Sequence, residues 1–240
     1  MASTYLNLTN RLLRKLNEVE IAEADFNITR GVQSLAKDAV RDAIAQINQA
    51  EYEWPFNAAQ HTQLLEVGQE EYSWPTTYKI ADWNTFQILG NPSLDAQHKM
   101  LDFTDRDIYF KYHKDTDDKA GTAGIRCPRM VAPSHGNGYI VTPSPDKEYT
   151  VQFKYYMNNV GLVNANDATR IPEVYENVII DGAIYYMYMF RDNPESAGVA
   201  IQVFQQGVKN MQSILINKYE SVYDTRVSKK LKSGKNYIGL

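Results

Sequence analysis

The sequence predicts an α+β protein in which an α-helical bundle carries an inserted, antiparallel β-rich domain. Apolar residues recur at three- and four-residue steps near the N-terminus and again over the last third of the chain, as they do in amphipathic helices. The middle of the chain is instead rich in short alternating, β-branched and aromatic segments, which are typical of strands. With 240 residues, 43% of them hydrophobic, the chain is long enough for a sizeable core.

The first two elements are predicted to be helices. Leu6, Leu13 and Leu16 share one face of a short helix over 5–17. We expect Thr29 to cap a second, longer helix. Apolar residues recur along it at helical spacing: Val32, Leu35, Ala36, Ala39, Val40, Ala43, Ile44 and Ile47. This helix must end before Pro55, because proline lacks an amide hydrogen and clashes with the preceding turn.

The phrase Glu-Tyr-x-Trp-Pro occurs twice, at 51–55 and 71–75. The first copy closes a helical pattern, whereas the second follows a strand pattern and precedes another. A structural repeat would also repeat the flanking periodicity, and these flanks differ. We therefore interpret the two copies as unrelated, and we expect Trp54 and Trp74 to cover core edges where helix and sheet meet.

Eight strands and one short helix are predicted in the middle of the chain. The strands are expected at 62–67, 70–74, 77–81, 84–89, 97–102, 125–132, 138–142 and 148–157. The helix is expected at 104–112. The stretch GYIVTPSPDKEYTVQFKYY, which begins at Gly138, predicts a hairpin in which a Pro-x-Pro-Asp turn joins the last two strands.

Two further helices are expected near the C-terminus. Pro172 suits the first position of a helix to about 191, and Asn193 with Pro194 suits the start of a second helix to about 222. The first of them is apolar on more than one face, so it needs more than one packing partner. After Asp224 the chain has five basic side chains, no acidic one and an apolar tip, Tyr237-Ile238-Gly239-Leu240. A docking peptide, a nucleic-acid arm and a plain solvated terminus all fit this tail.

These elements predict four parts. They are the N-terminal part of the bundle (1–58), the β-rich domain (59–160), a helical hairpin that completes the bundle (161–224) and the flexible basic tail (225–240).

Composition argues against several classes of protein. The formal charge of −4 gives no overall case for nucleic-acid binding, and one cysteine, Cys127, cannot form an intrachain disulfide. The N-terminus lacks the apolar core of a signal peptide. The most apolar run, 178–190, is too short to span a bilayer and contains Asp181. We expect a soluble protein of the cytosol, or of a particle assembled there, with no membrane partner.

Catalytic and metal-binding patterns are not found in the sequence. The four histidines have no metal-ligand spacing, and no phosphate loop or nucleophile elbow is present. Asp102, Asp105 and Asp107 could resemble the acid pair of a glycosidase, but helix capping by Asp105 and solvated surface charge explain them more simply. We expect no enzyme activity and no cofactor.

The order of elements resembles that of the head-to-tail adaptor (connector) proteins of tailed bacteriophages, and is similar to the tail tubular protein A group. The resemblance covers nearly the whole chain. Its most specific parts are the Pro-x-Pro-Asp segment before a Tyr-Tyr strand and the Ile-Pro-Glu that opens an aromatic helix. The β region at 84–147 is longer than in the smallest members of that group.

The resemblance implies a structural role in the virion, at the head-tail junction, after assembly in the host bacterial cytoplasm. Such adaptors form a ring, usually of twelve copies, beneath the portal protein. The ring extends the channel through which genomic DNA passes without specific binding, and supports the tail nozzle or the next tail protein, with tail fibres as a further partner. The five aromatic-helix residues would divide between the core and the next copy: Tyr185, Tyr186, Tyr188, Met189 and Phe190.

The tail at 226–240 is the hypothetical portal-docking segment. Its candidate contact residues are Arg226, Lys229, Lys230, Lys232, Lys235, Tyr237, Ile238 and Leu240. Three alternatives remain. The protein could be another neck, tail-completion or fibre-attachment ring protein, an enzyme or lysis factor that uses the Asp102–Asp107 cluster, or a DNA-binding module that uses the tail.

Overall fold

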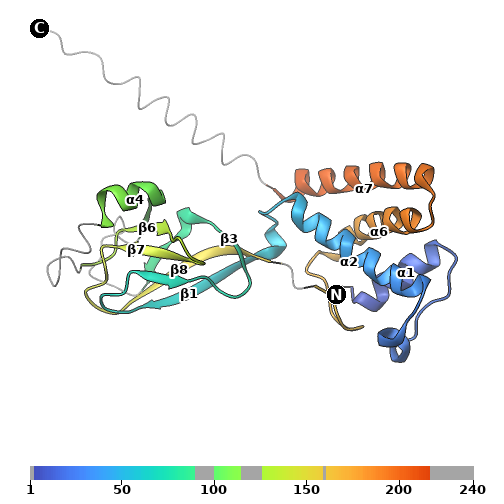
Figure 1. The fold of residues 1–240 in the computed structure, drawn as a ribbon, viewed down its shortest axis with the longest axis horizontal. Helices are drawn as coiled ribbons and strands as arrows, with labels where there is room; N and C mark the ends of the chain where they lie inside the picture. The colour runs from blue at the N-terminus through green and yellow to red at the C-terminus, as the bar shows by residue number, and fades with distance from the viewer. Residues whose placement is uncertain (1–2, 90–99, 115–125, 159–160, 217–240) are drawn as a thin grey trace, which may run out of the picture. The chain divides into compact units, whose positions relative to one another are not determined.

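The computed structural model describes residues 3–89, 100–114, 126–158 and 161–216, and confirms the predicted α+β class (Figure 1). The chain forms two compact units. A helical unit contains the described residues up to Phe56 and from Gly161 onward, and a β unit lies between Asn57 and Val160.

The helical unit contains α1 (Tyr5–Lys15), η1 (Glu23–Ile28), α2 (Val32–Ala50), η5 (Glu173–Tyr175), α6 (Glu176–Phe190) and α7 (Pro194–Leu215), together with the first part of η2 (Pro55–Asn57). α6 packs against α1, α2 and α7. Two ion pairs join α1 to α6: Arg11 Nη1 lies 2.7 Å from Glu176 Oε2, and Lys15 Nζ lies 3.1 Å from Asp181 Oδ1.

A close approach at Gly182 brings three helices together. A Cβ atom built there would lie 2.7 Å from the Phe204 ring of α7 and 3.0 Å from the Ala43 Cβ of α2. The first distance is shorter than an ordinary carbon–carbon contact and the second is at the lower limit of such contacts. Only glycine therefore fits at this position without a shift of its neighbours. The absence of a side chain on α6 therefore allows α2 and α7 to meet it at the same level.

The start of α7 agrees with the sequence, whereas the starts of α2 and α6 differ from it. α7 begins at Pro194, and the side chain of Asn193 accepts a hydrogen bond from the Ser196 amide at 3.2 Å, as predicted. The expected cap at Thr29 is wrong. α2 starts at Val32, after Gly31 with a φ of 60°, while the Thr29 hydroxyl donates to the Phe26 carbonyl.

The chain also departs from the expected pattern at Pro172. A turn of 3-10 helix follows this proline, so α6 begins only at Glu176. At the other end of the bundle α7 is described to Leu215, and the expected continuation to 222 lies almost entirely outside the described residues.

The buried faces of α1 and α2 differ from the predicted apolar sets. α1 buries Tyr5, Leu8, Leu12 and Leu13, whereas Leu6 and Leu16 lie only at the margin of the core. In α2 the buried stripe begins at Ala36, and Val32 and Leu35 are exposed at its N-terminal end. The first turn of α2 thus extends beyond the elements that cover the rest of the helix.

The β unit contains two four-stranded sheets. β8 (Tyr149–Met157) pairs with β1 (Ala58–Leu65) along one edge and with β3 (Tyr78–Ala81) and β4 (Gln87–Leu89) along the other. The second sheet has the order β2-β7-β6-β5, formed by β2 (Glu71–Ser73), β7 (Gly138–Thr142), β6 (Met130–Pro133) and β5 (Asp102–Phe103). All pairs are antiparallel except β5 with β6.

The predicted hairpin over 138–156 is wrong. β7 pairs with β2 and β6, whereas β8 belongs to the other sheet. All five residues of β7 are buried, as in a central strand, and β8 has partners on both edges. The segment with Pro143 and Pro145 therefore carries the chain from one sheet to the other. Likewise β1 and β2 lie in different sheets, although only a short turn separates them, in which Gly68 has a φ of 76°.

Other strand boundaries also shift. The expected strand at 84–89 is interrupted by η3 (Trp83–Thr85), which is capped where the Asn84 amide donates to the Asp82 carboxylate at 3.3 Å. β6 begins later than expected. Residues 97–99 of the strand expected at 97–102 lie outside the described residues, and β5 begins only at its last residue, Asp102. The short helix is present as α4 (Arg106–Tyr112).

The two tryptophans of the repeated phrase lie in different cores. Trp54 is fully buried in the helical unit, donates to the Ile47 carbonyl at 2.8 Å and stacks on Phe56. Trp74 belongs to the aromatic core of the β unit, where its ring stacks on Tyr78 with centroids 4.1 Å apart. The sequence similarity therefore reflects two independent packing roles.

Replacement of Gly182 by alanine should destabilise the helical unit. The added methyl group would overlap the buried Phe204 ring, so we expect a loss of about 1–3 kcal/mol in the free energy of unfolding. Gly198→Ala is the matched control, because nothing lies within 4 Å of the place its methyl group would occupy. That variant should gain about 0.5–1 kcal/mol from helix propensity. Urea denaturation of both variants tests this, and equal effects would contradict the packing described for Gly182.

Candidate functional site

No catalytic or metal-binding constellation is found among the residues that the structure describes. Within these ranges no group of three or more histidine, cysteine, aspartate or glutamate side chains could hold a metal ion. No described helix is long and apolar enough to cross a membrane. In the predicted carboxylate cluster, Asp105 caps α4 by accepting from the Asp107 amide at 2.9 Å, which is the structural role expected for it.

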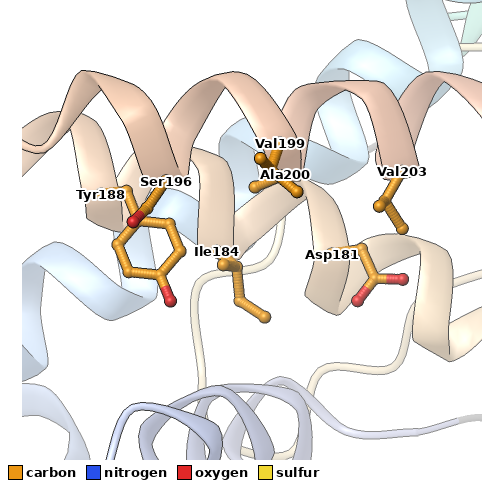
Figure 2. Close-up of a pocket in the computed structure, with 7 residues that line it drawn as sticks. All are labelled: Asp181, Ile184, Tyr188, Ser196, Val199, Ala200 and Val203. Carbon is orange, nitrogen blue, oxygen red and sulfur yellow. The ribbon is translucent and has the colours of Figure 1, made fainter.

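The helical unit has a groove between α6 and α7 with a volume of about 370 Å³. Figure 2 shows the lining side chains on the two helices. They are Asp181, Ile184 and Tyr188 of α6 and Ser196, Val199, Ala200 and Val203 of α7. We call this feature the α6–α7 groove.

Helical spacing on both helices forms the groove. Asp181, Ile184 and Tyr188 recur at steps of three and four residues, so they share one face of α6. With about 100° per residue, this face lies roughly opposite Gly182 and Tyr186, which meet α2. One side of α6 thus packs in the core, and the other side forms part of an open surface.

The walls of the groove are more apolar than a solvated surface requires. Val199 is 65% exposed and Val203 is 51% exposed. α7 carries only two charged residues in 22, Glu195 and Lys209. Because the cores of protein interfaces are depleted of charged side chains, this composition is typical of a surface that another protein covers.

Charged groups lie at the margins of the groove. The Asp181 carboxylate in its lining accepts from Lys15 of α1. Beyond the C-terminal end of α6, Arg191 pairs with Glu18 at 2.5 Å. Both pairs are partly exposed, so each contributes little to stability. The second pair connects the chain between α1 and η1 to the end of α6.

The structure separates the five aromatic-helix residues predicted to act together. Tyr186 packs against the helical core and its hydroxyl lies 3.2 Å from Gln46 Oε1 of α2; burial, with a smaller contribution from Asp42, raises its pKa. Tyr185 packs edge-to-face on Tyr186. Tyr188 lines the groove, and Met189 and Phe190 are about half exposed at the end of α6. Their role between copies stays a prediction.

Two sets of residues fall outside this description. The predicted portal-docking residues at 226–240 lie outside the described part of the chain. Conversely, Val199 and Val203 were not singled out from sequence. A signal was present, because two valines four residues apart occur in a helix with very few charges.

The model of the SU10 adaptor protein family matches residues 3–228, which is nearly the whole chain. The chain belongs to this family. No curated protein matches it. Membership makes the protein a bacteriophage adaptor and a virion component, and the structural character of the family implies a role without catalysis.

The groove valines should contribute little to the stability of the single chain. Val203→Ser should change the free energy of unfolding by less than about 0.5 kcal/mol, because this side chain is already half exposed. Val208→Ser, on the same helix, should cost about 1–3 kcal/mol because Val208 is buried. Thermal denaturation of the two variants distinguishes them, and a large loss for Val203→Ser would place that residue in the core.

Proposed function

We propose that this SU10-family adaptor forms a ring between the portal protein of the DNA-filled head and the tail, and that the ring extends the DNA channel. The observation that carries the proposal is the family match over residues 3–228, which spans both units. On this proposal the protein acts through surfaces and contains no reaction centre. It shares this role with the tail tubular protein A group, which its order of elements resembles.

The helical unit supports the ring in a specific way. In a protein that acts as a single chain, the apolar side chains along α7 would be covered by other residues of the chain or replaced by charged ones. Here Val199 and Val203 remain exposed beside a groove, and Tyr188 of α6 lies in the same lining. We assign this surface to contact with a neighbouring copy, with Met189 and Phe190 at its edge. Family resemblance makes twelve copies the expected number.

The C-terminal segment is proposed to contact the portal. Its charge pattern, five basic side chains after Asp224 and an apolar tip, suits a peptide that binds a partly acidic, partly apolar cleft. The family match ends at residue 228 and so covers only the first residues of this segment.

The β unit is proposed to face the tail nozzle or the next tail protein, with tail fibres as a further partner. Its interior is an unusually aromatic core that includes Trp74, Phe86, Tyr139 and Phe153. Phe86 and Phe153 stack with centroids 4.3 Å apart. Such large rings fill a core with few rotatable bonds, which favours a rigid platform. Genomic DNA would pass the ring without specific contacts.

The proposal is tested with purified protein and DNA-filled, tailless heads of the same phage. Electron microscopy of the mixture should reveal a ring beneath the portal. Binding only to isolated tails or fibres would instead identify another neck or tail component. Heads, tails and fibres that all remain unbound would contradict an adaptor role between head and tail.

Removal of residues 226–240 should abolish attachment to heads while the fold remains intact. The reason is that the described core residues of both units all precede residue 217, so the deletion removes none of them. A head-sedimentation assay measures attachment, and circular dichroism checks the fold. A charge-neutral variant of the five basic residues separates the contribution of charge from that of the apolar tip. Full attachment of the truncated protein would rule out this segment as the portal contact.

A further inference from the structure

The α6–α7 groove is concave and apolar, so its occupant should be convex, partly apolar and of matching charge. The helical unit itself offers one such segment, at the end of η1 and the start of α2. Ile28 is 70% exposed and Val32 is 38% exposed. Between them Gly31 adopts a φ of 60°, which turns the chain sharply. We call residues 28–32 the η1–α2 knob.

The charges on the knob and at the groove are opposite. Arg30 is exposed, and no carboxylate pairs with it within the described ranges. Glu195 is exposed in the first turn of α7, immediately before Ser196 in the groove lining, and no described cation pairs with it either. Asp181 also lines the groove, but its carboxylate is already paired with Lys15 of α1, so Glu195 supplies the unpaired negative charge. An arginine brought to this end of the groove would meet unneutralised carboxylate charge.

The knob and the groove helix lie at different edges of the helical unit. In Figure 1, α7 runs along the upper edge of this unit, and the blue segment between α1 and α2 extends from its lower edge. A surface and its complement on different edges of one molecule give a head-to-tail contact, which generates a ring when the rotation between copies closes. An isologous dimer would instead pair the groove with itself.

We infer that the η1–α2 knob of one copy docks in the α6–α7 groove of the next copy. Ile28 and Val32 cover the exposed valines of α7, and Arg30 meets Glu195. This inference rests on the proposed ring and specifies the two surfaces that form it. It also explains why Val32, although it belongs to the apolar pattern of α2, is not buried within its own chain.

A charge-exchange experiment tests this pairing on full-length protein. Arg30→Glu and Glu195→Arg are each mixed with DNA-filled, tailless heads, and heads with a complete ring are counted by electron microscopy. Each single reversal places like charges together, so ringed heads should fall at least about tenfold. The double variant should return to near the unchanged level. The matched control is the double variant Arg30→Glu with Asp38→Arg, in which the second change reverses the charge of an exposed residue on α2. The fraction of ringed heads should not recover in this control.

The outcomes separate this inference from the proposed function. If the unchanged protein forms no ring on heads, the proposed function fails and the inference fails with it. If it forms rings and the single variants do so equally well, the inference alone is wrong. Loss in both single variants without recovery in the double variant also overturns the pairing.

An Ile28→Asp variant tests the apolar part of the contact. It should fold normally, because Ile28 is exposed, and should form few rings.

Discussion

The packing of α6 on more than one side is the constraint on which the helical unit depends. At Gly182 the absent side chain lets Phe204 of α7 and Ala43 of α2 approach the same point on α6. This close contact commits one side of α6 to the core. The side with Ile184 and Tyr188 is left to form a groove with α7. Core packing and the open groove are therefore two consequences of one helix position.

The two units differ in how completely they bury their apolar side chains. The helical unit leaves apolar surface exposed along α7, which suits a protein that is completed by its neighbours. The β unit encloses its aromatic rings between two sheets, with β8 central in one and β7 in the other. On the proposed function, the helical unit would join copies together and the β unit would present a rigid surface to the tail.

Local signals made part of this structure predictable. The start of α7 follows from Asn193 and Pro194, and the cap of α4 follows from Asp105, because each depends on neighbouring residues alone. The pairing of β7 and β8 with different strands was missed because it depends on residues up to about a hundred positions away, such as Tyr155 with Ala59. The groove was missed for a related reason: the exposure of Val199 depends on what is absent beside α7, which periodicity cannot reveal.

The most direct test of the central claim is a cryo-electron-microscopy map of the neck in mature virions, with each unit fitted as a separate body. The account predicts density for this chain as a closed ring below the portal, in which the α6–α7 face of each helical unit lies against the next copy. Density for the chain at the tail tip or on fibres, or α6–α7 faces left open to solvent around the ring, would contradict it.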